Sequence, residues 1–239
     1  MNREIFLATI EQRLRSPVRL ALAGALVVFA AMPYLLTILF KTAGAGVAPA
    51  GHGGLLGLVF AAGVLGQEFS SGAPQITFTR PLPRWAWVLS RGAAVAALAA
   101  VCSLLPFGAA LLAGNAPGEV AIAALDQVLA AIGTSAVLVG LSSLVPGLTD
   151  LALVAGANIA LQILGVVAQF VQKEETRKAA EWLKDHLAPW FSPTLEFTAL
   201  YHGAGFSPHA VLVYASTGLF WFVVACWMVN RKELSYATD

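Results

Sequence analysis

The sequence predicts an all-α polytopic membrane protein with six transmembrane helices, an N-terminal interfacial helix and an outer amphipathic helix between the fifth and sixth spans. Apolar residue types make up 58% of the 239 residues and charged types only 11%. A soluble domain carries about 25% charged residues, so this chain has less than half the usual charge. The apolar residues also gather in runs close to the length of about 20 residues that crosses a hydrocarbon core. None of these runs alternates with a period of two, as the strands of a membrane barrel would.

Six apolar runs divide the chain, and we expect one transmembrane domain over residues 1–239. The second run is short and needs flanking residues such as Gly51 and His52 to span the bilayer. A signal peptide is the alternative for the first run, but this run exceeds the usual apolar segment of about 7–15 residues, so we expect a true span. The runs are Leu20–Phe40, Gly53–Gln67, Gly92–Ala113, Val120–Val145, Leu151–Val171 and Ala210–Val229.

The positive charges predict the orientation. Six spans put both termini on one side, and Lys and Arg favour the cytoplasmic side of short loops. With the N-terminus inside, nine of the 14 Lys and Arg residues are cytoplasmic, and four of the other five share one acidic loop. We therefore expect both termini in the cytoplasm. All four histidines then fall outside or at the outer interface, with a spacing too irregular for a metal motif; they are His52, His186, His202 and His209.

Residues 2–15 form a candidate interfacial elbow helix. Phe6, Ile10 and Leu14 recur every four residues and share one helix face, and Pro17 ends the helix before the first span. The alternative is a frayed basic tail that only sets the topology.

The segment 172–209 is expected outside the membrane and contains a candidate amphipathic helix over 173–188. Glu174 and Lys178 stand four residues apart and support this helix, while Pro189 and Pro193 are expected to end it. We expect it to lie on the outer membrane face or to cap the bundle, and we assign it no binding role. Its apolar stripe consists of Ala179, Trp182, Leu183, His186, Leu187 and Trp190.

Several polar residues lie inside the spans or at their ends. Asn158, Gln162 and Gln169 share one face of the fifth span. They are either hydrogen-bonding links between helices or part of a substrate path, and the sequence leaves both open. Asp126 is expected near the outer end of the fourth span, where it can reach water. Glu68 closes the second span, where Arg80 or Arg84 could pair with it. The small residues of Gly53–Gly57 would permit close helix contact.

Familiar catalytic motifs are absent from the sequence. It contains no Gly-Lys-Ser/Thr phosphate loop, no H-E-x-x-H and no G-x-S-x-G. We therefore expect no catalytic residue, no metal site and no enzyme activity in this chain. A net charge of +1 gives no sign of a nucleic-acid partner.

The stretch Gly66–Arg91, GQEFSSGAPQITFTRPLPRWAWVLSR, resembles the signature loop of ABC-2-type transporter permeases. In that family an acidic residue closes the second span, a small-residue and Gly segment follows, and a Thr-x-Pro-x-x-Arg run precedes the third span. The resemblance implies that residues 69–84 form the coupling-helix loop that receives force from an ATPase. The residues it implies for this role are Glu68, Ser71, Gly72, Thr79, Arg80, Pro81 and Arg84.

The resemblance implies the permease subunit of an exporter in a prokaryotic cytoplasmic (inner) membrane. A second copy or a paralogue would complete a dimer with the substrate path between the two permeases. Separate ATP-binding-cassette ATPase subunits would bind ATP and Mg, so this chain would hold no cofactor. Membrane lipid surrounds such a protein. The alternatives are an ion-coupled secondary transporter and a membrane assembly subunit without transport, and the substrate stays open.

Overall fold

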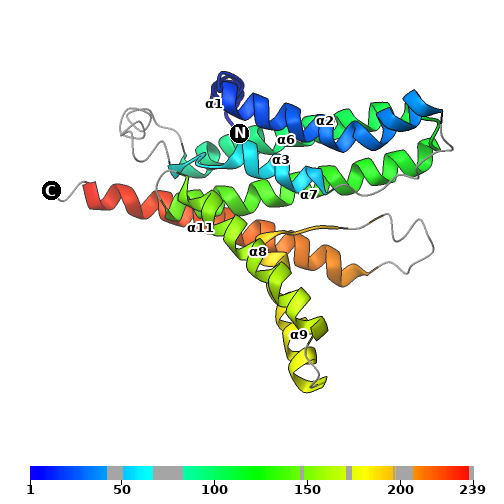
Figure 1. Ribbon diagram of the computed structural model, residues 1–239. Helices are drawn as coiled ribbons and strands as arrows, with labels where there is room; N and C mark the ends of the chain where they lie inside the picture. Colours follow the sequence, from blue (N-terminus) through cyan, green and yellow to red (C-terminus); the bar gives the residue numbers. More distant parts are fainter. Residues whose placement is uncertain are drawn as a thin grey trace.

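A computed structural model describes residues 1–41, 51–66, 83–145, 148–170, 174–195, 197 and 207–236. Within these residues every regular element is a helix (Figure 1). The helices are α1 (Arg3–Leu14), α2 (Pro17–Phe40), α3 (His52–Ala61), α6 (Arg84–Leu112), α7 (Pro117–Leu144), α8 (Thr149–Phe170), α9 (Glu174–Phe191) and α11 (Pro208–Tyr236).

Five helices of the described part of the chain are long and apolar enough to cross a membrane: α2, α6, α7, α8 and α11. They correspond to five of the six predicted runs, which supports a polytopic helical membrane protein. Each of these helices begins before the apolar run that predicted it. Pro17 and Pro117 stand at the first position of α2 and α7, and Pro83 directly precedes α6. Proline suits this place because the first helical N–H has no partner within the helix.

The second apolar run forms the helix α3, which has only ten residues. His52 begins it, and the Nε2 atom of His52 lies 2.9 Å from the carbonyl oxygen of Ser103. Ser103 stands nine residues before the end of α6, about 14 Å inside that end at 1.5 Å per residue. His52 is 3% exposed. His52 is therefore covered by the bundle rather than exposed at its end, because α3 begins partway along α6.

Helix α7 is the centre of the bundle, with α3 packed closely against one side of it. The amide of Gly53 donates a hydrogen bond of 2.9 Å to the Oε1 atom of Gln127. A Cβ atom at Gly53 would collide with the Gln127 backbone, and one at Gly57 would come within 2.8 Å of the carbonyl oxygen of Ala131. The close contact predicted for these two glycines is confirmed, and it fixes α3 parallel to α7.

Helix α11 packs against another side of α7 in the same parallel direction. Gly133 faces Tyr214, and Gly140 faces Trp221, so both partners advance by seven residues. The hydroxyl of Tyr214 donates to the carbonyl oxygen of Leu129 at 2.7 Å. Two large aromatic side chains therefore fit against α7 where it has no side chain of its own.

The N-terminal helix α1 crosses the end of the bundle at which α6 begins and α11 finishes (Figure 1). The side chain of Asn2 caps α1, and its backbone N–H donates to the hydroxyl of Ser90 at 2.7 Å. Thr9 and Arg13 face inward and are buried, whereas Leu14 of the predicted apolar stripe is exposed. The inward face of α1 is thus partly polar.

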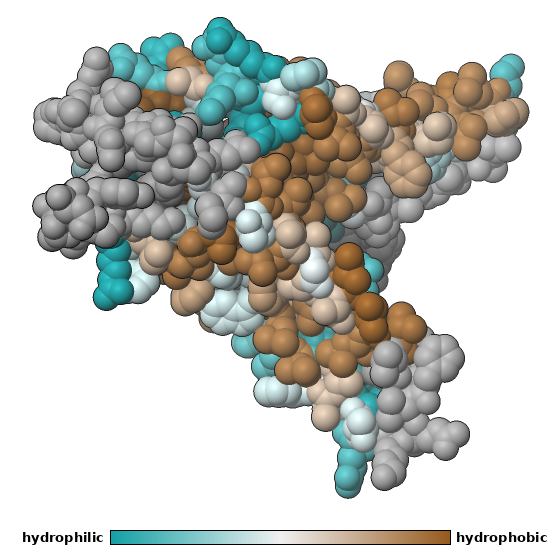
Figure 2. Space-filling view, turned by 60° about the vertical axis from the view of Figure 1, so that its left-hand side comes forward, coloured by the Kyte–Doolittle hydropathy of each residue, from teal (hydrophilic) through white to brown (hydrophobic). Residues whose placement is uncertain are grey.

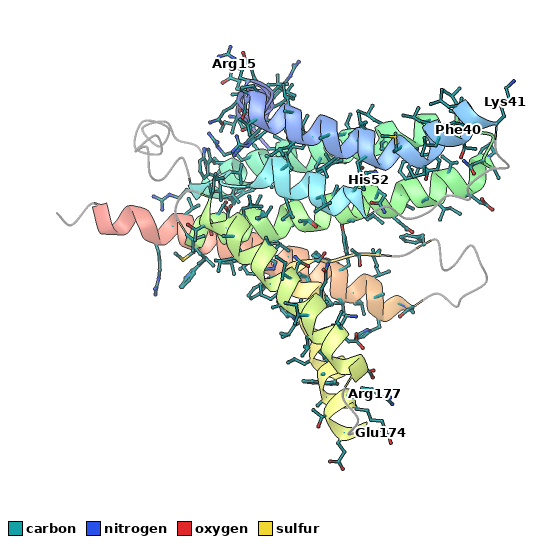
Figure 3. The ribbon with its side chains drawn as sticks, in the orientation of Figure 1. Arg15, Phe40, Lys41, His52, Glu174 and Arg177 are labelled. Atoms are coloured by element: carbon teal, nitrogen blue, oxygen red, sulfur yellow. The ribbon has the colours of Figure 1, made fainter. Side chains whose placement is uncertain are left out.

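Helices α8 and α9 form an antiparallel hairpin that leaves the bundle obliquely (Figure 1). Lys178 and Glu174 form the expected ion pair, at 2.7 Å. Pro189 does not end α9, which continues to Phe191, because the missing N–H of Pro189 removes only one hydrogen bond in its last turn. Figure 3 shows Glu174 and Arg177 at the tip of the hairpin, far from the bundle.

Candidate functional site: a buried polar junction

A tight turn ends α3 and directly precedes residues 67–82, which contain most of the predicted coupling loop and lie outside the described residues. Ala62 leaves the helical conformation, and Gly63 has a φ of 65°. A residue with a side chain is strained at this positive φ, so glycine suits the turn. The turn spans residues 62–65 and is buried.

Asp150 binds this turn from the first turn of α8. Its Oδ2 atom accepts the amide N–H of Gly63 at 2.7 Å, and its Oδ1 atom accepts the amide N–H of Leu151 at 2.8 Å. The residue is fully buried. A carboxylate in the first turn of a helix is also favoured by the positive end of the helix dipole. Asp150 therefore fixes the start of α8 to the end of α3.

Two arginines bind the same turn through a carbonyl oxygen. Arg13 of α1 donates from Nη1 to the carbonyl oxygen of Ala62 at 3.1 Å, and Arg19 of α2 donates from Nη2 to the same oxygen at 3.3 Å. Arg13 is 1% exposed. Both guanidinium groups interact electrostatically with Asp150. Opposite charges thus enclose one carbonyl and one amide of the turn.

Helix α7 completes the arrangement. The amide of Leu65 donates to the hydroxyl of Ser142 at 3.2 Å, and that hydroxyl donates to the carbonyl oxygen of Val139 at 3.2 Å. We call the set Arg13, Arg19, Ser142 and Asp150, together with the turn 62–65, the polar junction. It joins α1, α2, α7 and α8 around the end of α3.

Sequence reasoning missed the polar junction. In the sequence, Arg13 and Arg19 indicate only the orientation of the chain in the membrane. Asp150 precedes the fifth run, a place that a loop residue could equally occupy. The available signal was Thr149-Asp150 before an apolar run, which is a helix-start pattern. The pairing itself depends on contacts between residues 43 to 87 positions apart.

Of the predicted coupling residues, the structure describes Arg84 alone; Glu68, Ser71, Gly72, Thr79, Arg80 and Pro81 lie outside the described residues. Arg84 begins α6, and its Nη1 atom donates to the Oδ1 atom of Asn230 at 3.2 Å. Arg84 therefore links the start of α6 to the last part of α11. The second end of the segment 67–82 is thus attached to the bundle as well.

The three amides of the fifth run all fall within α8, but they form no common network in the described residues. Asn158 is half-buried, and its Nδ2 atom donates to the carbonyl oxygen of Val154 in its own helix at 2.9 Å. Gln162 is exposed, and the side chain of Gln169 lies outside the described part. The choice between helix linking and substrate path stays open.

Asp126 is expected to reach water, but the structure covers it. It is 7% exposed, and its Oδ1 atom accepts the amide N–H of Phe197 at 2.6 Å. This bond ties the chain that follows α9 back onto α7, so the carboxylate is covered rather than open to water.

A hollow of about 580 Å³ lies between the end of α9, residues 192–194 and the first part of α11. Its lining combines aromatic and aliphatic side chains with hydroxyls, a carboxylate and two imidazoles. The polar lining residues are Asp185, His186, Ser192, Thr194, His209, Tyr214, Ser216 and Thr217. No family model and no curated protein matches the sequence.

Proposed function

We propose that this protein is the transmembrane permease subunit of an ATP-binding-cassette exporter, driven by separate ATPase subunits that bind ATP and Mg. The polar junction carries the proposal, because it lies at the base of the segment that resembles a coupling loop. One end of residues 67–82 begins at the turn bound by Arg13, Arg19 and Asp150. The other end meets Arg84, which is bound to Asn230.

This attachment would convert a push on the loop into movement of several spans. Buried hydrogen bonds to charged groups are directional, and removing one partner leaves the other charge buried without compensation, which costs free energy. The turn and the start of α8 would therefore move with the loop rather than slide past it, and the exposed bond from Arg84 to Asn230 would link the start of α6 to α11. Helix α8, with Asn158, Gln162 and Gln169, would transmit this movement to the proposed substrate path.

A second copy or a paralogue would complete the transporter. Helices α8 and α11 bury only a small part of their surfaces in one chain. Figure 2 shows a hydrophobic surface that continues from the bundle onto the protruding hairpin. Lipid or a second permease must cover such a surface in a membrane. We propose that α8, and the hollow beside α9 and α11, face the partner permease in an assembly in the prokaryotic inner membrane.

The test begins with purification of the tagged full chain from its own membrane, followed by mass spectrometry of the proteins that accompany it. We expect an ATP-binding-cassette ATPase in a fixed ratio to the chain, and ATP-dependent transport by the complex in vesicles. Arg84→Gln should lower transport per ATP hydrolysed while membrane insertion stays normal. Transport by the chain without an ATPase would contradict the proposal.

One observation favours a second candidate, an ion-coupled secondary transporter. Asp150 is a fully buried carboxylate at the start of a candidate span, and buried ionisable groups in membranes often carry ions or protons. Its two oxygens each accept a backbone N–H, which also suits a fixed anchor. Transport that continues without ATP and stops when an ionophore collapses the proton gradient would favour this candidate.

A further inference from the structure

A narrow groove of about 200 Å³ runs along the outside of the bundle where α6, α7 and α11 meet. Small residues create it: Gly92, Ala93 and Ala96 of α6 leave space that Phe222 of α11 borders on one side. A Cβ atom at Gly92 would touch Val139 at 3.5 Å, so α7 closes the floor. The lining is entirely apolar, and its other members are Val88, Leu89, Ile132 and Ala136.

The groove leads toward a positively charged end of the same helices. Arg84 stands one turn before Val88 on α6, and its guanidinium is oriented by the hydrogen bond to Asn230 of α11. Asn230 in turn follows Phe222 by eight residues, about 12 Å along α11.

An aromatic side chain stands between the groove and this charged end. Trp85 is 53% exposed and stands one turn before the lining residue Leu89. Tryptophan favours the level of lipid headgroups, because its ring is apolar and its N–H is polar. Toward the start of α6 the apolar groove is therefore followed by an exposed tryptophan and then by an arginine.

We propose that this groove binds part of one acyl chain of an anionic phospholipid whose phosphate is held by Arg84. The groove accepts a hydrocarbon chain because every lining side chain is apolar. The charge selects an anionic headgroup, since guanidinium groups bind phosphate oxygens with strong, charge-assisted hydrogen bonds. This lipid would seal the α6–α11 seam at the end of the bundle that carries α1. The inference does not depend on the proposed transport function.

The experiment uses the purified full chain in a neutral detergent and needs no ATPase. Phosphatidylglycerol and phosphatidylcholine with identical acyl chains are titrated while thermal stability and bound lipid by native mass spectrometry are recorded. We expect phosphatidylglycerol to bind more tightly and to raise Tm more than phosphatidylcholine. Glycerol 3-phosphate, which has the headgroup charge without chains, should neither bind comparably nor compete.

Two variants test the two parts of the site. Arg84→Gln should weaken phosphatidylglycerol binding about fivefold, the effect of one positive charge near an anionic lipid surface, and Arg84→Lys should keep most of the preference. Ala93→Leu should fill the groove and weaken both lipids, and Ala136→Leu serves if Ala93→Leu does not fold. The matched controls are Arg15→Gln, an exposed arginine directly after α1, and Ala25→Leu, an exposed alanine on α2.

Equal affinity for the two phospholipids would overturn the proposal. So would unchanged binding in Arg84→Gln or in both groove variants. Effective competition by glycerol 3-phosphate would also overturn it, because the bound group would then be a phosphate without an acyl chain.

Discussion

Asp150 is the residue on which the polar junction depends most, because it faces two arginines and holds two backbone amides. We expect Asp150→Ala to lower the free energy of unfolding by about 3–5 kcal/mol, since it leaves buried positive charge without its partner. Thermal denaturation of the purified chain measures this loss. The control is Glu11→Ala, which breaks an exposed pair with Arg15 and should cost at most about 1 kcal/mol. Similar Tm values for both variants would show that the junction does not stabilise the fold.

Gly140 allows Trp221 to reach the surface of α7. A Cβ atom at this position would come within 2.5 Å of the Trp221 ring and 2.9 Å of its carbonyl oxygen. We expect Gly140→Ala to lower the free energy of unfolding by roughly 1–3 kcal/mol, the usual cost of overpacking. Gly156→Ala is the control, because Gly156 has open space around it and alanine favours a helix by about 0.5–1 kcal/mol. A Tm that rises in both variants would contradict the close α7–α11 packing.

At the scale of elements, the lengths of the apolar runs predicted the long helices, and the apolar parts of these helices lie where the runs place them. The boundaries differ because an apolar run marks only the part of a helix that lies in hydrocarbon. Helix α6 begins at Arg84, eight residues before the predicted start at Gly92, since the helix continues from Pro83 through a polar and aromatic first section. Sequence periodicity contains no information about where a helix leaves the bilayer.

Two features could not be read from the sequence because they depend on contacts between distant elements. The starting depth of α3 is fixed by its packing on α7 and by the bond between His52 and Ser103. The polar junction likewise needs α1, α2 and α8 to meet at one turn. A run of fifteen apolar residues is compatible with a tilted span or with a half-length helix, and only the tertiary structure decides between them.

The Asp126 carboxylate ties the segment after α9 to α7, and this provides a test at the element scale. We expect Asp126→Ala to speed hydrogen exchange of the Phe197 amide and of the amides of Ser192, Thr194 and Leu195, because a hydrogen bond to a charged group is worth about 1.5–3 kcal/mol. Exchange in α2 should not change. Glu119→Ala, a half-buried acidic residue on the same helix, is the control. Unchanged protection at Phe197 in Asp126→Ala would mean that other contacts hold this segment.

At the scale of the whole molecule, apolar surface and charge are separated as a membrane requires. Figure 2 shows hydrophobic residues over the middle of the bundle and hydrophilic residues gathered over one end. Arg15 marks the end that carries α1, and Lys41 marks the opposite end of α2 (Figure 3). Helix α2 has 24 residues, about 36 Å at 1.5 Å per residue, which is enough to separate these two residues by a bilayer.

Labelling at these two positions tests the orientation that the charge distribution predicts. In a chain whose Cys102 and Cys226 are replaced by alanine, we expect Lys41→Cys to react with a membrane-impermeant thiol reagent added to intact cells. Arg15→Cys should react only after the membrane is opened, because nine of the 14 Lys and Arg residues would otherwise lie outside. Both side chains are exposed, so a lack of reaction reports the side of the membrane rather than burial. Reaction of Arg15→Cys in intact cells would reverse the orientation and place residues 67–82 away from any cytoplasmic ATPase.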